Sequence, residues 1–532
     1  MPETMKRVKA FLQSRKRLHG IAYVAFIILL SSLSFWRVLT FDFWRDDWRL
    51  LCTIENPLLL PTLFHKIELH WGAWIENALL FPVFGWDPLW WHVFGIALRV
   101  VGAFAVAAMV FGLSRSKKIG ALAGLFFAAS FSGLEAIGWP SVHVASVVII
   151  FLCTGVYFWH KYSYEKKIKN VALGFLLLTG AVLASPARSL PILVVLPFIE
   201  FFSWWTAEVK EALWRIAVRF ASLSTILITV TLLLTSRLDV VLGINTDAGW
   251  YIQRLTQRPE LLKNYFSTIG NLLFGWIVPI QESMGLVAYN QRIAIMALLV
   301  VIGGGMCGLV YGLRKKSHRA LFAVFFLVWV LLFYVPGYLF FPTVIGGSHR
   351  YIAVAGVGLV GVMAFLVGSI KNTIVCFLTA VLFITLNVVT SNRILKKEST
   401  HRSFRVVENV LQNIVKDFPK KEHGSIVMLL GNPELHYSIL EMPGSVAYAA
   451  KIHACGDYGH FFPTTDTNLI MGLLCDDAPK ERQLGALPLP PSPVPLSKVH
   501  AWEIEGETIK NVSQREQERL REQARSRGCE PL

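Results

Sequence analysis

The sequence is short of charge. Of its 532 residues only 16% are Asp, Glu, Lys or Arg, whereas 54% are hydrophobic. A soluble protein is usually about one quarter charged, and a soluble chain of this length would divide into several domains of average composition. Acidic residues are scarcer than basic ones, which gives a formal net charge of +16. The composition excludes an ordinary soluble protein.

Paired cysteine motifs and internal repeats are missing as well. The seven cysteines form no Cys-x-x-Cys pair, which excludes the common zinc-ribbon proteins. No helical repeats follow the apolar part of the chain, which excludes a solenoid domain there. We interpret four cysteines in or near apolar runs as small apolar residues: Cys52, Cys153, Cys307 and Cys376.

The remaining cysteine chemistry lies in the C-terminal part. Two histidines and two cysteines there could bind zinc, although their spacing fits no common zinc site: His453, Cys455, His460 and Cys475. A disulfide between Cys455 and Cys475 is at least as good an interpretation if this part lies in an oxidising compartment outside the cytoplasm.

Apolar runs dominate the first 390 positions. Runs of roughly 20 residues recur there, which is the length that a helix needs to cross about 30 Å of hydrocarbon. They predict an all-α polytopic membrane bundle of about 11 transmembrane helices. The predicted spans are 20–39, 91–113, 119–134, 140–159, 170–185, 189–205, 217–235, 293–313, 320–341, 351–370 and 373–390.

Basic residues cluster beside the apolar runs. Four clusters each adjoin a run: 6–17, 115–118, 161–169 and 314–319. Because cytoplasmic loops are rich in Lys and Arg, the clusters predict a multi-pass protein of the plasma (inner) membrane. Residues 1–19 would lie in the cytoplasm and the C-terminus outside it. This placement makes the lipid bilayer, rather than nucleic acid, the partner of the positive charge.

Two long segments are predicted to lie on the outer side, 40–90 and 236–292. Within the second, Asn264–Pro279 is apolar enough to enter the membrane, but a full crossing there would invert every later basic loop. We therefore expect a re-entrant or interfacial helix. The transmembrane module as a whole would span residues 20–391.

The C-terminal segment, 392–532, differs in kind because it is polar and holds no run long enough to cross a membrane. Ser425–Leu430 predicts a buried strand, and Val499–Ile504 with Thr508–Val512 predicts a hairpin. A proline-rich linker and a charged helix or disordered tail are expected at 484–496 and 514–527. We predict a small α/β extracytoplasmic domain.

Two adjacent carboxylates, Asp46 and Asp47, follow the first apolar run almost without a spacer. They lie in the stretch Phe41–Trp48, among tryptophans and arginines. Ionised groups beside hydrocarbon are costly, so they indicate a function. The alternative is an interfacial belt, which is common at helix ends. Like charges raise the pKa of one member of such a pair and make it a better general base near neutral pH.

The predicted topology places further polar residues near the outer ends of spans: Glu135, His143, Arg188, His349 and Arg350. Carboxylates in the first two outer loops, with arginines in later ones, predict an outward-facing cavity. Such a cavity could bind a phosphate and supply a general base. Each residue also has an ordinary interpretation, as a solvated helix end or an interfacial anchor.

Short motifs carry a resemblance to a known superfamily. Glu135-Ala-Ile-Gly-Trp139 lies in the second outer loop, and His349-Arg-Tyr-Ile352 enters a late span that continues with Gly356 and Gly358. Over roughly residues 20–390 the chain resembles the GT-C integral-membrane glycosyltransferases, close to the protein O-mannosyltransferase and lipid A aminoarabinose transferase group. The resemblance implies a sugar donor linked to polyprenyl phosphate and used on the non-cytoplasmic face.

The resemblance also implies roles for these residues. Asp46 or Asp47 would deprotonate the acceptor, and Glu135 would orient it or share a divalent cation, Mg or Mn, with the acidic pair. Three residues would hold the donor phosphate: Arg350, Arg188 and His349. Aromatic and imidazole side chains would bind the sugar or the acceptor: Trp48, Trp71, Trp139 and His143. For the tryptophans the alternative is an interfacial helix.

Two departures from the family pattern bear on the acceptor. Ala187-Arg188-Ser189 stands where relatives often carry Lys-Glu, so Arg188 could replace the lysine while the acidic partner is missing. His70-Trp-Gly-Ala-Trp74 stands where an aromatic-Arg-Pro sequence is common.

These observations predict a membrane glycosyltransferase that transfers a sugar from a polyprenyl-phosphate carrier to an extracytoplasmic glycan, lipid or protein. The main alternative is a transporter or flippase for a lipid-linked glycan, and a third is a non-catalytic membrane scaffold whose outer domain binds. A transporter would carry ionisable residues within its spans and an internal repeat. We interpret the spans as nearly free of charge and find no repeat between the halves, which favours the enzyme.

Overall fold

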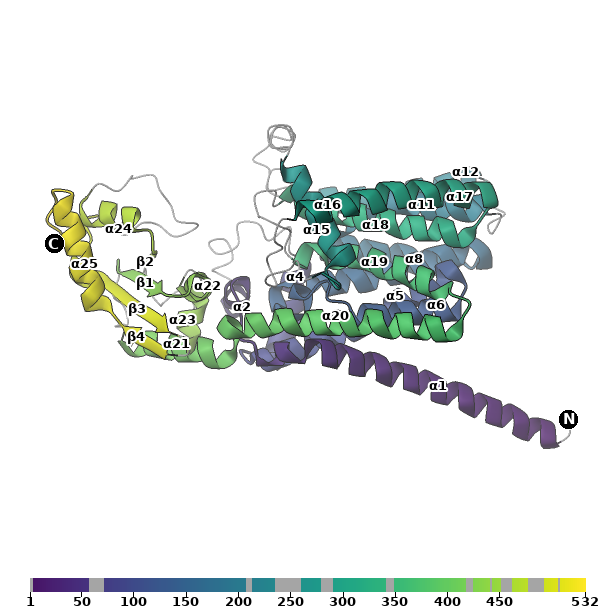
Figure 1. Cartoon of the computed structure of the whole chain (residues 1–532), viewed down its shortest axis with the longest axis horizontal. Coiled ribbons are helices and arrows are strands. Elements are labelled where there is room, and N and C mark those ends of the chain that lie inside the picture. Colours follow the sequence, from purple (N-terminus) through teal and green to yellow (C-terminus); the bar gives the residue numbers. More distant parts are fainter. Residues whose placement is uncertain are drawn as a thin grey trace.

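Helices lie side by side along most of the molecule, and a small sheet lies beyond one end of them (Figure 1). The computed structural model describes residues 3–56, 71–206, 213–234, 260–278, 290–340, 349–417, 424–440, 443–450, 462–476, 492–505 and 508–532. The N-terminus of the first helix points away from the sheet, so the two chain ends lie at opposite ends of the molecule. The predicted class, a polytopic helical bundle with a small C-terminal α/β domain, is confirmed.

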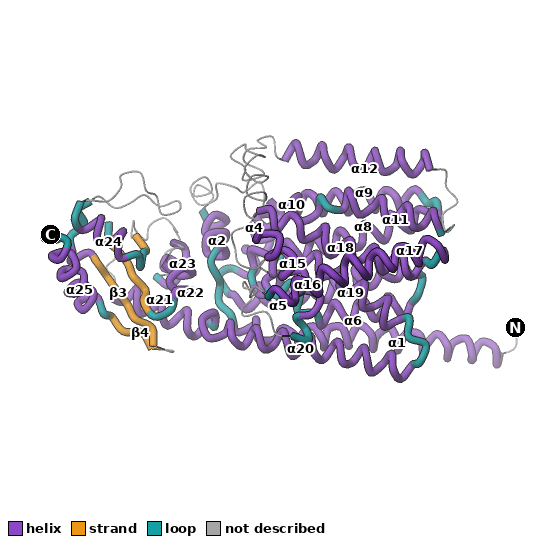
Figure 2. Tube along the Cα trace, turned by 45° about the horizontal axis from the view of Figure 1, so that its top comes forward, coloured by secondary structure: helices purple, strands orange, loops and turns teal. Residues whose placement is uncertain are grey.

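Seven helical segments in the described ranges are long and apolar enough to cross a membrane, judged by length and composition. They are formed by α1 (Glu3–Phe35) with η1 (Trp36–Thr40), α5 (Pro88–Ser114), η4 (Pro140–Val142) with α8 (Val144–Glu165), α12 (Leu213–Leu234), α16 (Gln291–Leu298) with η5 (Leu299–Gly304) and α17 (Gly305–Lys315), α18 (His318–Phe340), and α20 (Thr373–Arg402). Further helices of the bundle are α6 (Lys117–Ala129), α9 (Ile168–Ala184), α11 (Ile192–Trp205) and α19 (His349–Gly368). Every predicted span falls on one of these helices, and α12 lies at the edge of the bundle (Figure 2).

The end of the bundle that faces the sheet, here called the sheet end, carries short helices in its connections. They are α2 (Asp46–Glu55), α4 (Trp71–Phe84), α7 (Glu135–Gly138) and α10 (Pro186–Ser189). The backbone of α4 touches the end of α9, because a Cβ atom at Gly72 would collide with the carbonyl group of Ala184. These connections are therefore packed pieces of structure rather than free loops.

The helix α15 (Glu260–Phe274) occupies the apolar segment for which a re-entrant or interfacial helix was expected. Its 15 residues cover only about 22 Å, which is less than the thickness of the hydrocarbon layer. It packs closely on α16, since a Cβ atom at Gly270 would lie 2.8 Å from the carbonyl oxygen of Ile293. The part of the expectation that reaches Pro279 lies outside the described residues.

Charged side chains do lie inside apolar helices, which corrects the interpretation of the spans as nearly charge-free. Arg99 is buried within α5 and donates to the carbonyl oxygens of Ser130 and Ser132 at the end of α6. Arg219 of α12 is paired with Glu200 of α11 at 2.7 Å. Both arginines thus have structural partners, as a buried charge requires, and neither indicates a transport path.

The C-terminal domain begins where α20 ends. After α21 (Phe404–Asp417), four strands form a sheet in the order β2-β1-β3-β4. The strands are β1 (Ile426–Leu430), β2 (Phe462–Pro463), β3 (Val499–Glu505) and β4 (Thr508–Asn511). β1 runs parallel to β2 and β3, and the predicted hairpin is confirmed as the antiparallel pair of β3 and β4.

Short helices complete this domain: α22 (Pro433–Leu435), η6 (His436–Leu440), α23 (Pro443–Ala449), α24 (Thr467–Leu474), η7 (Leu496–Lys498) and α25 (Ser513–Ser526). The segment predicted as a charged helix or a disordered tail forms α25. It buries Leu520 and Ala524 against the sheet core, as an amphipathic surface helix does.

The disulfide predicted between Cys455 and Cys475 is wrong. Cys475 is bonded to Cys529 instead, 54 residues further along the chain. The reason is spatial, because Cys475 ends α24 and Cys529 follows α25, and these two helices pack together. The same bond removes Cys475 from the alternative zinc set, whose other members lie outside the described residues. Cys52 is also disulfide-bonded and is not a plain apolar residue.

Replacing Cys529 by Ser is expected to destabilise the C-terminal domain. A disulfide that closes a loop of this length restricts the unfolded chain and typically contributes about 2–4 kcal/mol. The purified protein should therefore unfold at a lower temperature and lose the cross-linked peptide pair in a non-reducing digest. Cys307→Ser is the matched control, because Cys307 is an exposed free cysteine. Equal melting temperatures for both variants would contradict the bond.

Candidate active site

The chain turns sharply between the first span and α2. Phe41 forms an isolated antiparallel bridge with Ser403, and the backbone of Arg45 has a positive φ of 47°. Such a conformation is uncommon for a residue other than glycine. It lets α2 start at Asp46, so that Asp46 and Asp47 both lie in the first turn, where the helix dipole favours negative charge.

Asp47 is fully buried, and both of its carboxylate oxygens accept hydrogen bonds from backbone groups. Oδ2 accepts from the N–H of Trp44 at 2.9 Å, and Oδ1 accepts from the N–H of Ser141 at 2.7 Å. Because Ser141 lies between α7 and α8, Asp47 joins the first two predicted outer loops. Asp46 beside it is only partly buried. The structure therefore distinguishes two adjacent carboxylates, of which the sequence left open which one is the base.

Burial raises the pKa of Asp47 from 3.8 to about 7. The two backbone N–H groups and the positive charge of Arg402 act in the opposite direction, because each of them favours the carboxylate form. The loss of hydration outweighs them. Asp47 thus exchanges its proton near neutral pH, which suits a general base.

Arg402, the last residue of α20, is a component of this site that no sequence motif indicated. The 30 residues of α20 extend over about 45 Å, so the helix is longer than a membrane crossing requires. Its last turn reaches the loop before α2. There the guanidinium of Arg402 lies 5.0 Å from the ring centres of both Phe41 and Trp44 and is almost completely buried.

The buried guanidinium connects three carboxylates. Arg402 interacts electrostatically with Asp47, Glu135 and Glu398, each of which stabilises its positive charge. Its Nη2 also donates to the carbonyl oxygen of Gly138 at 2.7 Å. A buried charge is tolerated only when it is paired and hydrogen-bonded. Arg402 therefore brings the first predicted outer loop, the second one and the end of the last span to one point.

The loop from Glu135 to His143 is held in place along its whole length. Besides the Arg402 contact at Gly138, Nε2 of His143 lies 3.2 Å from the carbonyl oxygen of Ile137. The hydroxyl of Ser146 donates to the carbonyl oxygen of Ala136 at 3.2 Å. Glu135, at the start of this loop, is buried like Asp47 and shares its positive neighbour. The structure thus brings two of the predicted catalytic residues, Asp47 and Glu135, into one electrostatic cluster.

Asp42 is a further buried carboxyl group in this cluster that the sequence did not single out. Its Oδ1 accepts from the N–H of Phe43 at 2.6 Å, and its own N–H donates to the carbonyl oxygen of Arg402 at 2.8 Å. Burial, together with the negative charges of Glu408 and Asp47, raises the pKa of Asp42 well above its ordinary range. Asp42 therefore holds its proton more tightly than an exposed aspartate.

The aromatic residues near Asp47 form a packed cluster. Trp48 is fully buried, stacks on Trp86 with ring centres 6.1 Å apart, and contacts Tyr448 of α23 at 5.3 Å. The cluster attaches α23 of the C-terminal domain to α2. Trp139 is also almost fully buried, and the side chain of Trp71 lies outside the described residues. Sugar or acceptor binding by these tryptophans and by the buried His143 stays a prediction.

The predicted phosphate-binding residues are not gathered at Asp47 by any contact that the structure describes. Arg188 lies in α10, which packs against α8, α9 and α18, and its Nη1 donates to the hydroxyl of Ser185 at 3.1 Å. His349 and Arg350 begin α19, which packs against α7. Their side chains lie outside the described residues, so their role stays a prediction.

The predicted divalent cation stays a prediction. Among the residues that the structure describes, no three His, Cys, Asp or Glu side chains lie close enough to hold a metal ion. In addition, both oxygens of Asp47 are directed at backbone N–H groups, and its nearest strong charge is a guanidinium. We therefore derive no step through a cation bound by Asp46, Asp47 and Glu135.

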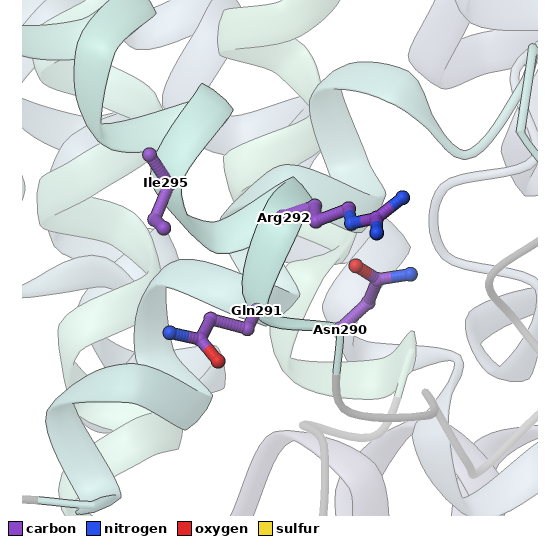
Figure 3. Close-up of a pocket in the computed structure, with 4 residues that line it drawn as sticks. All are labelled: Asn290, Gln291, Arg292 and Ile295. Carbon is purple, nitrogen blue, oxygen red and sulfur yellow. The ribbon is translucent and has the colours of Figure 1, made fainter.

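An open hollow of about 630 Å³ lies at the N-terminal end of α16. Its described lining consists of Asn290, Gln291, Arg292 and Ile295, and Asn290 and Arg292 extend toward the same side (Figure 3). None of the predicted site residues is among these four. No motif in the sequence indicated this hollow.

Arg402, Glu398 and Asp42 belong to this cluster, but the sequence indicates them only weakly. Glu398 and Arg402 lie shortly after the last apolar run and are four residues apart, a spacing that places both on one helix face. Asp42 lies inside the stretch Phe41–Trp48 but is separated from the adjacent acidic pair. Recognising either residue required knowledge of where α20 ends relative to α2.

The fold and this cluster define the class of the molecule. It is a polytopic membrane protein with the GT-C fold, with buried acidic groups and a buried arginine at the sheet end of its bundle. No family model matches the sequence, and no curated protein matches it. The resemblance to the GT-C fold that the sequence motifs indicated is confirmed.

Solved structures supply the comparison. The oligosaccharyltransferase AglB of Archaeoglobus fulgidus, in complex with an inhibitory peptide and a dolichol-phosphate, is similar with a TM-score of 0.50 at 11% identity. The match covers 87% of this chain and 68% of that one, so this chain spans about two thirds of AglB. The apo form of the same enzyme is similar with a TM-score of 0.48 at 11% identity, and the match covers 85% of this chain and 65% of that one. ArnT from Cupriavidus metallidurans in the apo state is similar with a TM-score of 0.44 at 10% identity, and the match covers 92% of this chain and 93% of that one.

Proposed function

We propose that the protein is a glycosyltransferase that takes a sugar from a polyprenyl-phosphate carrier and transfers it at the Asp47 site. The observation that carries the proposal is Asp47 itself, a buried carboxyl group that titrates near neutral pH and is aimed by backbone groups of two loops. The shared fold with AglB, an oligosaccharyltransferase solved with dolichol-phosphate, supports this chemistry.

In the proposed reaction the carboxylate of Asp47 accepts the proton of the acceptor while the acceptor oxygen or nitrogen attacks the anomeric carbon. The bond between that carbon and the phosphate oxygen breaks, and the electron pair leaves with the polyprenyl phosphate. A single displacement of this kind inverts the anomeric configuration. Arg402 favours the carboxylate form of Asp47 and fixes the loop at Gly138. We assign the leaving phosphate to Arg350, with Arg188 and His349 as further candidates.

We infer that the site faces away from the cytoplasm and acts on a glycan, a lipid or a protein there. The Cys475–Cys529 disulfide and the disulfide-bonded Cys52 support this orientation, because disulfides persist in oxidising compartments. The basic turn at Arg115–Lys118 lies at the opposite end of α5 from the candidate site, where the positive-inside rule expects the cytoplasm.

The proposal is tested with the purified protein in proteoliposomes. Labelled polyprenyl-phosphate-linked mannose, glucose and aminoarabinose serve as donors, and a cell-envelope extract serves as the source of acceptors. The expected result, with at least one donor, is movement of label from the carrier lipid to another molecule, whether a glycan, a protein or a second lipid that is separated from the carrier by chromatography. Movement of intact lipid-linked sugar across the vesicle membrane, without transfer of the sugar to an acceptor, would support the transporter instead. Donor binding with neither reaction would support the scaffold.

The transfer rate is expected to depend on pH in a defined direction. Because the base must be unprotonated, the value of kcat/KM should rise as the pH passes through about 7, where Asp47 loses its proton. An ordinary aspartate would place the same rise near pH 4. The measurement is kcat/KM with one donor between pH 5 and pH 9, at intervals of about half a pH unit. A rate that is flat across this range would contradict Asp47 as the base.

A further inference from the structure

The helix α4 carries an acidic residue on its packed face. Ala73, Asn77 and the partly buried Leu80 lie on that face, and Glu76 belongs to it by helical spacing. The opposite face, with Leu79, is strongly exposed and apolar. Burying a carboxyl group on the inward side of such a helix costs free energy unless it interacts with a polar partner. Its presence there indicates such a partner in the interior of the protein.

Glu76 faces His143. Its Oε1 lies 3.8 Å from Nδ1 of His143, and among the described residues neither carboxyl oxygen of Glu76 has a hydrogen-bond partner. The imidazole is completely buried, and its other nitrogen lies 3.2 Å from the carbonyl oxygen of Ile137. The fit on that side is close, since a Cβ atom at Gly95 would lie 2.7 Å from Nε2 of His143.

The chemistry of the contacts determines where the protons lie. A carbonyl oxygen only accepts, so Nε2 of His143 must carry the hydrogen that it donates to Ile137, and Nδ1 presents a lone pair. Facing that lone pair, an ionised Glu76 would be repelled, whereas the hydrogen of a protonated Glu76 is attracted to it, across a distance of 3.8 Å that is longer than a direct hydrogen bond. Burial raises the pKa of Glu76 to about 8, which keeps the carboxyl group protonated at neutral pH.

We propose that Glu76 is a positioning residue of the Asp47 site, which selects the tautomer of His143 whose Nε2–H holds the loop at Ile137. That loop begins with Glu135 and also contains Ser141, whose N–H binds Asp47. Glu76 therefore acts on the site through His143 and touches no reacting atom. The inference rests on the proposed function for its kinetic part, and on the loop geometry alone for its structural part.

The kinetic test compares two substitutions at one position. Glu76→Ala removes the carboxyl group that faces Nδ1 and is expected to lower kcat on the order of 10- to 100-fold, the usual effect of a small displacement of catalytic groups. KM for the donor should change by less than about 3-fold, because none of the residues that we assign to the donor phosphate lies in this loop. Glu76→Gln keeps a neutral donor and is expected to recover most of the lost kcat. Asn77→Ala, on the same helix face, controls for the packing of α4.

The structural test needs no activity. In protein labelled with nitrogen-15 histidine, the His143 signals are assigned by their loss in His143→Gln. Wild type and Glu76→Gln should show the Nε2–H tautomer, and Glu76→Ala should show a mixture of tautomers. An unchanged tautomer in Glu76→Ala, or a kcat for Glu76→Gln as low as that of Glu76→Ala, would overturn the proposal. If no variant, wild type included, transfers sugar while the tautomer still shifts, the positioning role stands and the proposed function fails.

Discussion

Asp47→Asn is expected to lower kcat for sugar transfer on the order of 100- to 10,000-fold, the range that general-base catalysis contributes. The amide has almost the shape of the carboxyl group but cannot accept the acceptor's proton. Donor affinity should be preserved, because Asp47 is aimed at Trp44 and Ser141 and is not assigned to the carrier phosphate. The measurement is single-turnover transfer together with a binding titration using polyprenyl phosphate.

The same substitution should also destabilise the site slightly. Both backbone N–H groups that reach Asp47 need an acceptor, and an asparagine offers only one oxygen. Leaving a buried N–H without a partner costs about 1–3 kcal/mol. Asp46→Asn is the matched control, since Asp46 is partly exposed, and it should retain transfer within about 5-fold of wild type if its charge is largely screened by solvent. An equal loss of transfer activity in both variants would contradict the assignment of Asp47 as the general base.

Arg402→Met is expected to have the second large effect, on both stability and activity. It would leave Asp47, Glu135 and Glu398 without the buried positive charge that they share. Removing one partner of a buried ion pair costs roughly 3–5 kcal/mol. Because the charge of Arg402 lowers the pKa of Asp47, its loss should also shift the rising limb of the pH profile to higher pH.

Two comparisons make the Arg402 prediction specific. Arg402→Lys keeps the charge but loses the planar fork of donors, so it should shift the pH profile less than Arg402→Met does. Arg405→Met, three residues along the chain, removes an exposed arginine and should change neither the melting temperature nor the pH profile. If Arg402→Met leaves the pH profile in place, Arg402 is not the electrostatic partner of Asp47.

The helices of the bundle could be predicted because the length and apolarity of a run are local properties of the sequence. The strands β1, β3 and β4 followed from local patterns in the same way. The roles of single charges inside apolar runs were harder to predict. Arg99 and Arg219 could not be interpreted from the sequence because their partners, at the end of α6 and in α11, lie far away along the chain.

The candidate site was predictable only in part, for the same reason. The acidic pair was visible as two charges beside a membrane span, yet which of them is buried depends on the turn at Arg45, whose φ is positive. Arg402 enters the site because α20 extends past the bilayer, which no motif indicates. The Cys475–Cys529 bond likewise depends on how α24 packs on α25. Contacts between distant segments, rather than local preferences, account for what was missed.

The most direct measurement of the central claim is the release of free polyprenyl phosphate from a labelled lipid-linked sugar, with an acceptor present, by wild type and Asp47→Asn in parallel. Both proteins should be shown by melting temperature and donor binding to be folded. If Asp47 is the general base, wild type releases polyprenyl phosphate at a rate that rises through about pH 7, and Asp47→Asn releases almost none at any pH. Equal release by the two proteins would contradict the assignment of the site.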